Sequence, residues 1–271
     1  MTPAALAMTI RAALRGVGLL VLFAGAAVDF ALTIACSRRR DRLPRQARWL
    51  HRWARSCAAL LGLDIQRRGR LPRAGMIISN HLSYLDIFAY SAIAPCVFVA
   101  KQEVAGWPVL GRFARMAGTI FVDRTRRQDV ARTNAEIERA LRLGTRVVLF
   151  PEGTSSDGRT VLPFRTSLLE PVLRLDSAVV PAALRYDLTD GDVASEICYW
   201  GEMTLLPHLL NALTKRRIAA RLSFGRATHG VGSRKVLADS LHESVNTLRA
   251  IPRRSVSCLR IGAGELVRSD G

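Results

Sequence analysis

The sequence predicts an α/β protein, in which helices cover a mixed, mostly parallel central sheet and a membrane-associated helical segment comes first. Two observations predict this fold. Short apolar runs, typical of buried strands, alternate along the chain with segments whose apolar residues recur at helical spacing. The first forty residues also contain an apolar stretch as long as a bilayer is thick.

The length of 271 residues suits one large α/β domain or two small ones. We expect three regions along the chain. Residues 1–44 form an N-terminal membrane anchor, residues 45–251 form the globular domain, and residues 252–271 form a basic, flexible tail.

The anchor is predicted from residues 16–36, a run of twenty-one residues in which only Asp29 and Thr33 are clearly polar. As a helix, this run reaches about 30 Å, the hydrocarbon thickness of a bilayer. The heavier basic flank follows it, so the positive-inside rule keeps the globular domain in the cytoplasm, and we expect the anchor to lie in the inner membrane. The arginine run at residues 38–40 disfavours a cleaved signal peptide. A buried helix of a soluble protein is the alternative, and spanning, hairpin and monotopic insertion all fit the sequence.

The later elements are expected from their apolar patterns. A first helix is expected at 44–63. Buried strands are expected at 76–79, 96–100, 119–122, 146–150, 178–186, 194–201 and 217–225. Further helices are expected at 85–94, 107–117, 128–143, 166–176, 205–215 and 233–251, the last of them capped by Ser233.

The charge indicates an anionic partner. The chain carries 40 basic and 22 acidic residues, a net charge of +18. Nucleic acid, anionic lipid and a phosphate-bearing substrate all fit this balance. Aromatic residues make up only 6% and no zinc-finger, RNA-recognition or G-x-x-G signature occurs, which disfavours nucleic acid. We therefore expect an anionic membrane surface, at about 1 kcal/mol per nearby Lys or Arg. The five scattered cysteines fit a reduced compartment and predict no metal site.

The stretch "NHLSYLD", residues 80–86, allows two interpretations. Ser83 and Asp86 match a helix-capping box, so the stretch can simply begin a helix. Alternatively, His81 lies in the turn before that helix and folds back, so that Asp86 accepts a bond from one ring nitrogen. The other nitrogen is then left as a base. On one continuous helix, two positions five apart point about 140° away from each other, so the pair requires such a turn.

A histidine–aspartate pair usually activates a nucleophile. No G-x-S-x-G elbow and no reactive-looking cysteine occurs in the sequence, which disfavours a lipase or esterase. The nucleophile can instead be the hydroxyl of the substrate. That is the chemistry of a transferase, in which the base deprotonates an alcohol and the alcohol attacks an activated acyl group.

Three further stretches follow in order: "GTIFVDR" (118–124), "FPEGTSSDG" (150–158) and "VVPAAL" (179–184). With "NHLSYLD" they resemble the four motif blocks of the glycerolipid acyltransferases of lysophosphatidic-acid type. The resemblance covers roughly residues 63–224 and implies that residues 45–251 are an acyltransferase domain. It implies transfer of a fatty acyl group from acyl-CoA or acyl carrier protein to a lysolipid hydroxyl, with no cofactor and no metal.

The resemblance also implies roles for individual residues. His81 would be the general base and Asp86 its orienting partner. Arg124 would hold the polar head of the acceptor, and the third block would help to bind it through Glu152, Gly153 and Thr154. Val180 and Pro181, in the fourth block, would shape the acyl site.

Each of these residues has an ordinary structural alternative. Arg124 begins a basic run and fits a solvated surface, and Glu152 fits a turn residue beside Gly153. Lys101 follows a strand, which makes it a candidate phosphate contact or a surface lysine. His208 lies alone in an apolar helix and is expected to be structural.

One departure from the family pattern concerns the acceptor. The third block commonly reads E-G-T-R, and Ser155 stands at the arginine position here. Serine carries no charge and forms no bidentate phosphate contact. Either Arg159 or Arg165 supplies the missing charge, or the acceptor's head group differs. The variant resembles the branch of lyso-ornithine lipid acyltransferases, which is the alternative acceptor.

Two non-catalytic functions remain as alternatives to the enzyme. One is a basic nucleic-acid-binding protein, and the other is a membrane scaffold that keeps the fold without activity. An intact His81 and Asp86 argue against the scaffold.

Overall fold

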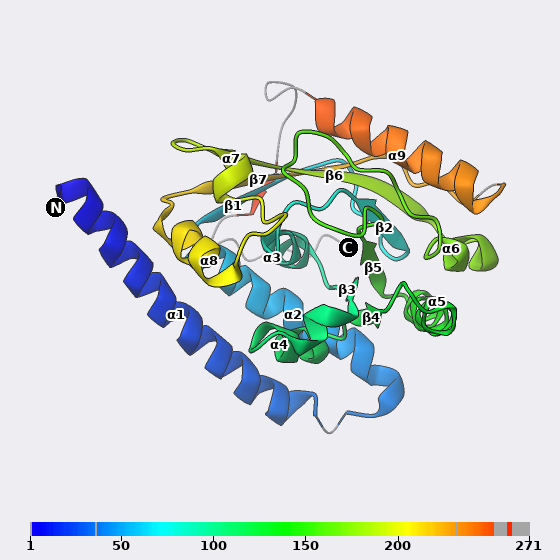
Figure 1. The fold of residues 1–271 in the computed structure, drawn as a ribbon. Helices are drawn as coiled ribbons and strands as arrows, with labels where there is room; N and C mark the ends of the chain where they lie inside the picture. The colour runs from blue at the N-terminus through cyan, green and yellow to red at the C-terminus, as the bar shows by residue number, and fades with distance from the viewer. Residues whose placement is uncertain (1, 36, 231, 252–258, 262–271) are drawn as a thin grey trace.

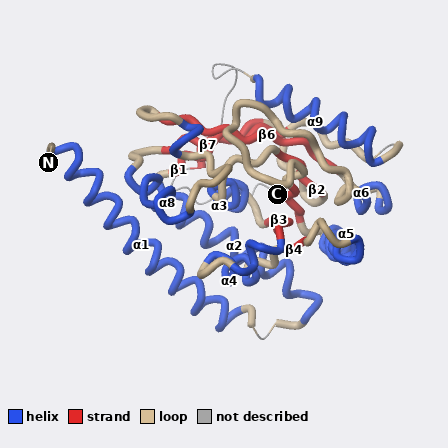
Figure 2. Tube along the Cα trace, in the orientation of Figure 1, coloured by secondary structure: helices blue, strands red, loops and turns tan. Residues whose placement is uncertain are grey.

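The computed structural model describes residues 2–35, 37–230, 232–251 and 259–261. Within these residues, one sheet of eight strands has the order β4-β3-β5-β2-β6-β7-β1-β8 (Figure 1, Figure 2). The strands are β1 Leu63–Arg68, β2 Met76–Ser79, β3 Cys96–Lys101, β4 Ile120–Val122, β5 Arg146–Leu149, β6 Val179–Leu188, β7 Ile218–Phe224 and β8 Leu259–Ile261. Neighbours are parallel except at β6–β7 and β1–β8, which confirms the predicted mixed, mostly parallel sheet.

Helices lie on both sides of this sheet (Figure 1). They are α1 Pro3–Thr33, α2 Arg39–Leu61, α3 Leu85–Ile93, α4 Leu110–Met116, α5 Arg127–Arg142, α6 Glu170–Leu175, α7 Val193–Glu196, α8 Leu205–Thr214 and α9 Arg234–Ala250, with a 3₁₀ helix at Gln102–Gly106. Ser233 caps α9 as predicted, because its side chain accepts a hydrogen bond from the Val236 amide.

The central strand β2 explains why the apolar runs predicted strands. All four of its residues are buried, with β5 and β6 as parallel neighbours. Ile77 packs in one apolar cluster with residues of α2 and α3, whereas Met76 and Ile78 pack in another with residues of α5 and α9. A strand covered on both faces needs apolar residues at every position, so a continuous run is the expected pattern.

Two expectations about individual elements were wrong. Residues 194–201 do not form a strand, because Asp192 caps the short helix α7 by accepting from the Ser195 amide. The first helix ends at Leu61, where Gly62 takes the left-handed conformation (φ 73°), and β1 follows unpredicted. In the tail, for which we expect flexibility, residues 259–261 form β8 beside β1, while 252–258 and 262–271 lie outside the described residues.

Helix α1 is held against the rest of the protein along much of its length. Near one end, Arg11 donates to the Thr214 carbonyl (2.6 Å) at the end of α8. Near the other end, the Asp29 carboxylate accepts from Arg52 (2.6 Å) and Trp53 (2.7 Å) of α2. Figure 1 shows α1 running along one side of the molecule past α8 and α2. Among the described residues, α1 is the helix long and apolar enough to cross a bilayer.

The division expected at residue 44 falls inside α2, which runs without a break from Arg39. Cys57, Cys96 and Cys198 are free and buried, as expected, whereas Cys36 and Cys258 lie outside the described residues.

Candidate active site

The candidate site lies where the central strands end. β2 leads into the loop that carries His81, and β5 leads into the loop from Phe150 to Gly153. The two strands are adjacent and parallel, so their carboxyl ends meet at the same edge of the sheet. This edge is where open α/β sheets bind their ligands.

His81 and Asp86 are in direct contact. The ring Nδ1 of His81 lies 2.7 Å from Oδ2 of Asp86, whose side chain is fully buried. The same carboxylate accepts from the Leu82 amide (2.8 Å) and from the Tyr186 hydroxyl (2.8 Å). A carboxylate accepts hydrogen bonds, so Nδ1 carries the proton and donates it, which leaves Nε2 of the neutral ring as the acceptor. The contact predicted from the spacing is present.

The capping box is only half formed. Helix α3 begins at Leu85 with Tyr84 as its N-cap residue, and the buried Ser83 hydroxyl has no hydrogen-bond partner in the described part of the chain. The predicted Ser83 cap was therefore wrong. The other half is present, because the Asp86 carboxylate accepts from the Ser83 amide (3.2 Å). Asp86 thus holds the chain before the helix and contacts His81 with the same oxygen.

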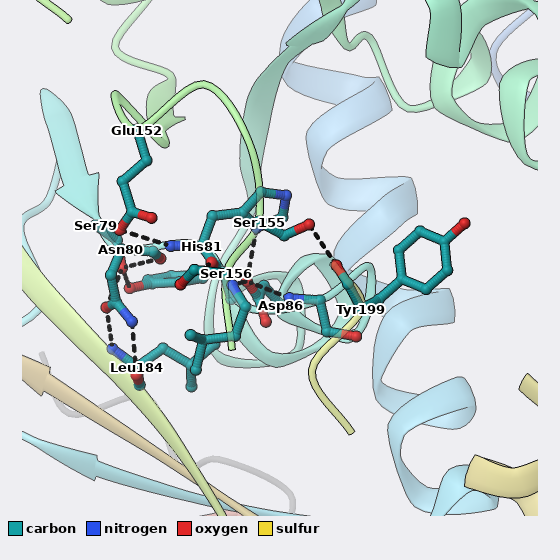
Figure 3. A network of polar contacts seen from close by, with 12 residues as sticks. Ser79, Asn80, His81, Asp86, Glu152, Ser155, Ser156, Leu184 and Tyr199 are labelled. Carbon is teal, nitrogen blue, oxygen red and sulfur yellow. Dashed lines mark hydrogen bonds and ion pairs between the residues drawn. The ribbon is translucent and has the colours of Figure 1, made fainter. Parts of the chain in front are cut away.

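The third block holds His81 in place. Its ring stacks on Phe150, with centroids 4.2 Å apart and planes 11° from parallel. Its carbonyl accepts from the Ser156 amide (3.0 Å), and its own amide donates to Oε1 of Glu152 (3.3 Å) (Figure 3). The His81 side chain nevertheless keeps 23% of its surface exposed. A rigid but accessible imidazole is the arrangement that a proton acceptor needs.

Glu152 does not face solvent, although the family resemblance implied acceptor binding. It is 4% exposed, Oε1 binds the His81 amide, and Oε2 is buried without a hydrogen-bond partner among the described residues. Burial is the main cause that raises the pKa of this carboxyl to about 8. In the structure Glu152 supports the backbone of His81.

At Gly153, the Arg124 side chain of the second block lies close to the backbone of the third block. The φ of Gly153 is +75°, which favours glycine, and a Cβ atom there would lie 2.5 Å from Nη1 of Arg124, so the guanidinium would have to move to make room for a side chain. Arg124 follows β4, and burial, followed by the charge of Arg165, lowers its pKa. Thr154 is exposed, with its hydroxyl 3.5 Å from the Ser155 carbonyl.

Lys101 stands apart from this group. It is exposed at the end of β3, where it pairs in register with Val122 of β4. Within the described ranges, no hydrogen bond or ion pair joins Lys101 to His81, Asp86 or Arg124. It therefore lies at the same sheet edge as Arg124 but outside the network around His81.

Comparison with known proteins assigns the family. A family model described as Acyltransferase matches residues 63–185. A 1-acyl-sn-glycerol-3-phosphate acyltransferase of Neisseria meningitidis is 33% identical over 193 residues, covering 70% of this chain and 75% of that protein. This chain belongs to the acyltransferase family.

Two further relatives support the family and the fold. A lyso-ornithine lipid O-acyltransferase of Rhizobium meliloti is 37% identical over 202 residues, covering 69% of this chain and 68% of that protein. The crystal structure of the 1-acyl-sn-glycerophosphate acyltransferase of Thermotoga maritima matches with a TM-score of 0.57 at 17% identity, over 89% of this chain and 100% of that chain. At 17% identity, the similarity to the Thermotoga maritima structure shows only that the two proteins share a fold.

In this acyltransferase, the network around Asp86 also contains residues to which the sequence analysis assigned no role. Tyr186, on β6, donates to the Asp86 oxygen that does not face His81, and burial raises its pKa well above the usual range, so it stays a hydroxyl donor. The Asn80 amide bonds both the amide (2.9 Å) and the carbonyl (3.0 Å) of Leu184 (Figure 3). No sign of this role for Tyr186 appears in the sequence, because it lies in the buried, mostly apolar run of β6, where any residue can simply pack in the core. Knowing that β2 and β6 are neighbours in the sheet would have indicated that Tyr186 lies near the loop that follows β2.

His208 has the structural role expected of it. It is buried, its Nδ1 lies 3.1 Å from the Tyr84 hydroxyl, and its Nε2 lies 3.1 Å from the Cys198 carbonyl. Burial lowers its pKa, which favours the neutral ring.

Replacing Glu152 by glutamine tests its environment. An ordinary glutamate ionises near 4.5, whereas this carboxyl stays protonated up to a pKa of about 8 in the folded state. The folded protein therefore binds a proton that the unfolded chain has released. This contribution is fully present below about pH 4.5 and is lost as the pH rises through about 8. We expect wild type to lose unfolding free energy relative to Glu152→Gln between about pH 5 and 8, in denaturant titrations at each pH. A difference that stays constant with pH would contradict the assignment.

Proposed function

We propose that this acyltransferase transfers a fatty acyl group from acyl-CoA or acyl carrier protein to the hydroxyl of a lysolipid. The supporting observation is the His81–Asp86 pair, fixed by buried hydrogen bonds and exposed enough to reach a substrate. Relatives named as acyltransferases of 1-acyl-sn-glycerol 3-phosphate and of lyso-ornithine lipid supply the two candidate acceptors.

In this mechanism, His81 is the general base. Its Nε2 takes the proton from the acceptor hydroxyl as the oxygen attacks the thioester carbonyl. The C–S bond then breaks, and the departing thiolate takes up the proton from the imidazolium. Asp86 keeps Nδ1 protonated and stabilises the transient positive charge on the ring, which is how a carboxylate assists a histidine base.

The first candidate acceptor is a 1-acylglycerol 3-phosphate in phospholipid biosynthesis. Arg124 favours it, because a half-buried cation beside the third block suits a phosphate. Lyso-ornithine lipid is the second candidate. The observation that favours it is the Ser155 hydroxyl, which donates to the Tyr199 carbonyl and therefore does not act as a head-group cation (Figure 3). Purified protein offered both lysolipids, each with acyl-CoA and with acyl carrier protein, tests the choice by the rate of acyl transfer.

The placement of α1 favours attachment to the membrane surface without crossing it. The hydrogen bond of Arg11 keeps α1 against α8, and those of Asp29 keep it against α2. If α1 crossed the bilayer, it would therefore draw these two helices into the bilayer. Exposed apolar side chains lie along α1 and continue on α8 at Leu206 (65% exposed) and Leu210 (51%). The structure therefore supports monotopic insertion of an apolar face, with anionic lipid attracted by the net charge of +18. We place the catalytic domain at the cytoplasmic face of the inner membrane.

Replacing the base and its partner tests the mechanism. His81→Ala should lower the transfer rate by about 10²–10⁴-fold, because general-base catalysis contributes that much. Asp86→Asn should lower it by about 10²-fold or more, since the amide no longer stabilises the imidazolium. Initial rates and thermal unfolding are measured together. Unchanged turnover in His81→Ala would rule out the mechanism, and a loss of stability without loss of rate in Asp86→Asn would make Asp86 only a helix residue.

Tyr186→Phe tests the second oxygen of Asp86. Without the hydroxyl donor, the carboxylate keeps more of its charge for the imidazolium, so the acid limb of the pH–rate profile should move to higher pH. The lost bond to a charged group should also cost about 1.5–3 kcal/mol of stability. The pH profile of kcat/KM separates these effects. A destabilised variant with the wild-type profile would show that Tyr186 only supports the fold.

Replacing both Leu206 and Leu210 by glutamine tests the membrane-facing surface. Burial of a leucine is worth about 1.5–3 kcal/mol, so the double variant should bind vesicles at least tenfold more weakly. The measurement is sedimentation with vesicles containing anionic lipid. Val236→Gln is the control, because Val236 is similarly exposed (59%) but lies on α9, away from α1 and α8 (Figure 1). Equal binding by all three proteins would contradict the proposed surface.

A further inference from the structure

A second buried histidine reaches the turn that holds His81. His208 lies on α8 and is 7% exposed. Its Nδ1 lies 3.1 Å from the Tyr84 hydroxyl, and its Nε2 lies 3.1 Å from the Cys198 carbonyl. Tyr84 is the N-cap residue of α3 and stands between His81 and Asp86 in the chain. The side chain of His208 therefore ties α8 to the start of the helix that carries Asp86.

The two partners of His208 decide where its proton lies. A carbonyl oxygen only accepts hydrogen bonds, so Nε2 carries the proton and donates it to Cys198. Nδ1 then has the lone pair and accepts from the Tyr84 hydroxyl. Burial lowers the pKa of His208, so the ring is neutral at neutral pH and keeps both bonds. Because the protein occupies both ring nitrogens, His208 holds its neighbours and does not act as a base.

The segment before α8 is bonded to the same turn. The Tyr199 amide donates to the Leu82 carbonyl (2.8 Å), and the Tyr199 carbonyl accepts from the Ser155 hydroxyl (Figure 3). The rings of Tyr199, Tyr84 and His208 contact one another edge to face, with centroids 5.3, 5.5 and 5.6 Å apart. Aromatic pairs in this arrangement are favourable beyond the area that they bury. A shift of α8 and of the segment leading into it would therefore move Leu82 and Tyr84 as well.

The opposite side of α8 is exposed and apolar. Leu206 is 65% exposed and Leu210 is 51% exposed, whereas His208 between them is buried. Positions two apart on a helix point about 160° away from each other, so the two leucines face outward when the histidine faces the turn. Only the width of α8 thus separates the surface proposed to face the membrane from the turn that holds His81.

We infer that His208 is a positioning residue for acyl transfer, which holds the turn of His81 and Asp86 in a fixed place relative to α8. The turn is then placed so that Nε2 of His81 meets the acceptor hydroxyl. Misplacement of a reacting group by about 1 Å can cost about 10²-fold in rate, so even a small shift of the turn lowers the rate. His208 acts through Tyr84 and touches no reacting atom. This inference rests on the proposed function.

Tyr84→Phe and two replacements of His208 test the link. Asparagine places its side-chain oxygen near the Nδ1 position and still accepts from Tyr84, whereas glutamine places its amide near the Nε2 position and keeps only the bond to Cys198. Tyr84→Phe and His208→Gln should each lower kcat by about two- to tenfold, the factor that one neutral hydrogen bond is worth, and leave KM for donor and acceptor unchanged. His208→Asn should recover most of the rate. The double variant Tyr84→Phe/His208→Gln should be no slower than either single variant, because both remove the same bond.

His242→Asn is the matched control. Nε2 of His242 also lies near a carbonyl, that of Val161 (3.2 Å), but His242 is on α9, away from α8 (Figure 1). The shorter side chain loses this bond, so the control should lower the midpoint of thermal unfolding and keep the kcat of wild type. Initial rates with 1-acylglycerol 3-phosphate and with lyso-ornithine lipid are measured beside thermal unfolding. A kcat that follows the unfolding midpoint in all variants, or that stays at the wild-type value in Tyr84→Phe and His208→Gln, would overturn the inference and leave the proposed function intact.

If wild type acylates neither lysolipid, the proposed function fails and the link is judged by amide hydrogen exchange. The amides of Leu82 and Ser83 donate to Asp86, so their exchange reports opening of the turn. Exchange about two- to tenfold faster in Tyr84→Phe and His208→Gln, with His208→Asn and His242→Asn at the wild-type rate, would support the hold of His208 on the turn. Equal exchange in all five proteins would overturn it.

Discussion

The buried carboxylate of Asp86 is the constraint on which the rest of the site depends. A buried carboxylate is costly unless hydrogen bonds satisfy it. Here the donors come from the His81 ring, from the amides of Leu82 and Ser83, and from the Tyr186 hydroxyl. One group therefore fixes the loop before α3, attaches it to β6 and orients the imidazole. Removing the charge would disturb all three, so the same residue determines the local fold and, in the proposed mechanism, assists the histidine base.

Other segments complete this arrangement from the same edge of the sheet. Phe150 stacks on the imidazole, and Glu152 supports its backbone amide. Gly153, by having no side chain, lets Arg124 and Arg165 approach the third block. His81, Glu152 and Arg124 thus lie within a few residues of the ends of parallel strands, whereas Arg165 lies further along the loop that follows β5. The apolar faces of α1 and α8 are a separate surface, suited to a lysolipid acceptor that resides in a membrane.

Much of the fold could be predicted because the sheet is covered on both faces, so buried strands appear as plain apolar runs. The contact of His81 with Asp86 was one of two interpretations of its stretch, and the later motif blocks, rather than the spacing of five, favoured it. The apolar pattern of residues 194–201 predicted a strand, but Asp192 caps a short helix, α7, at the start of this segment. Tyr186 and the inward turn of Glu152 were missed, because both depend on which strands are neighbours, and sequence spacing carries no such information.

The central claim is that Asp86 holds one tautomer of His81, with the proton on Nδ1 and the lone pair on Nε2. Nitrogen-15 NMR of protein labelled in its histidine rings tests this most directly, at a pH where the ring is neutral and with His81→Ala to assign the signals. The account predicts a protonated Nδ1 and an unprotonated Nε2 for His81. A ring protonated at Nε2, or one that averages between the two tautomers, would contradict it.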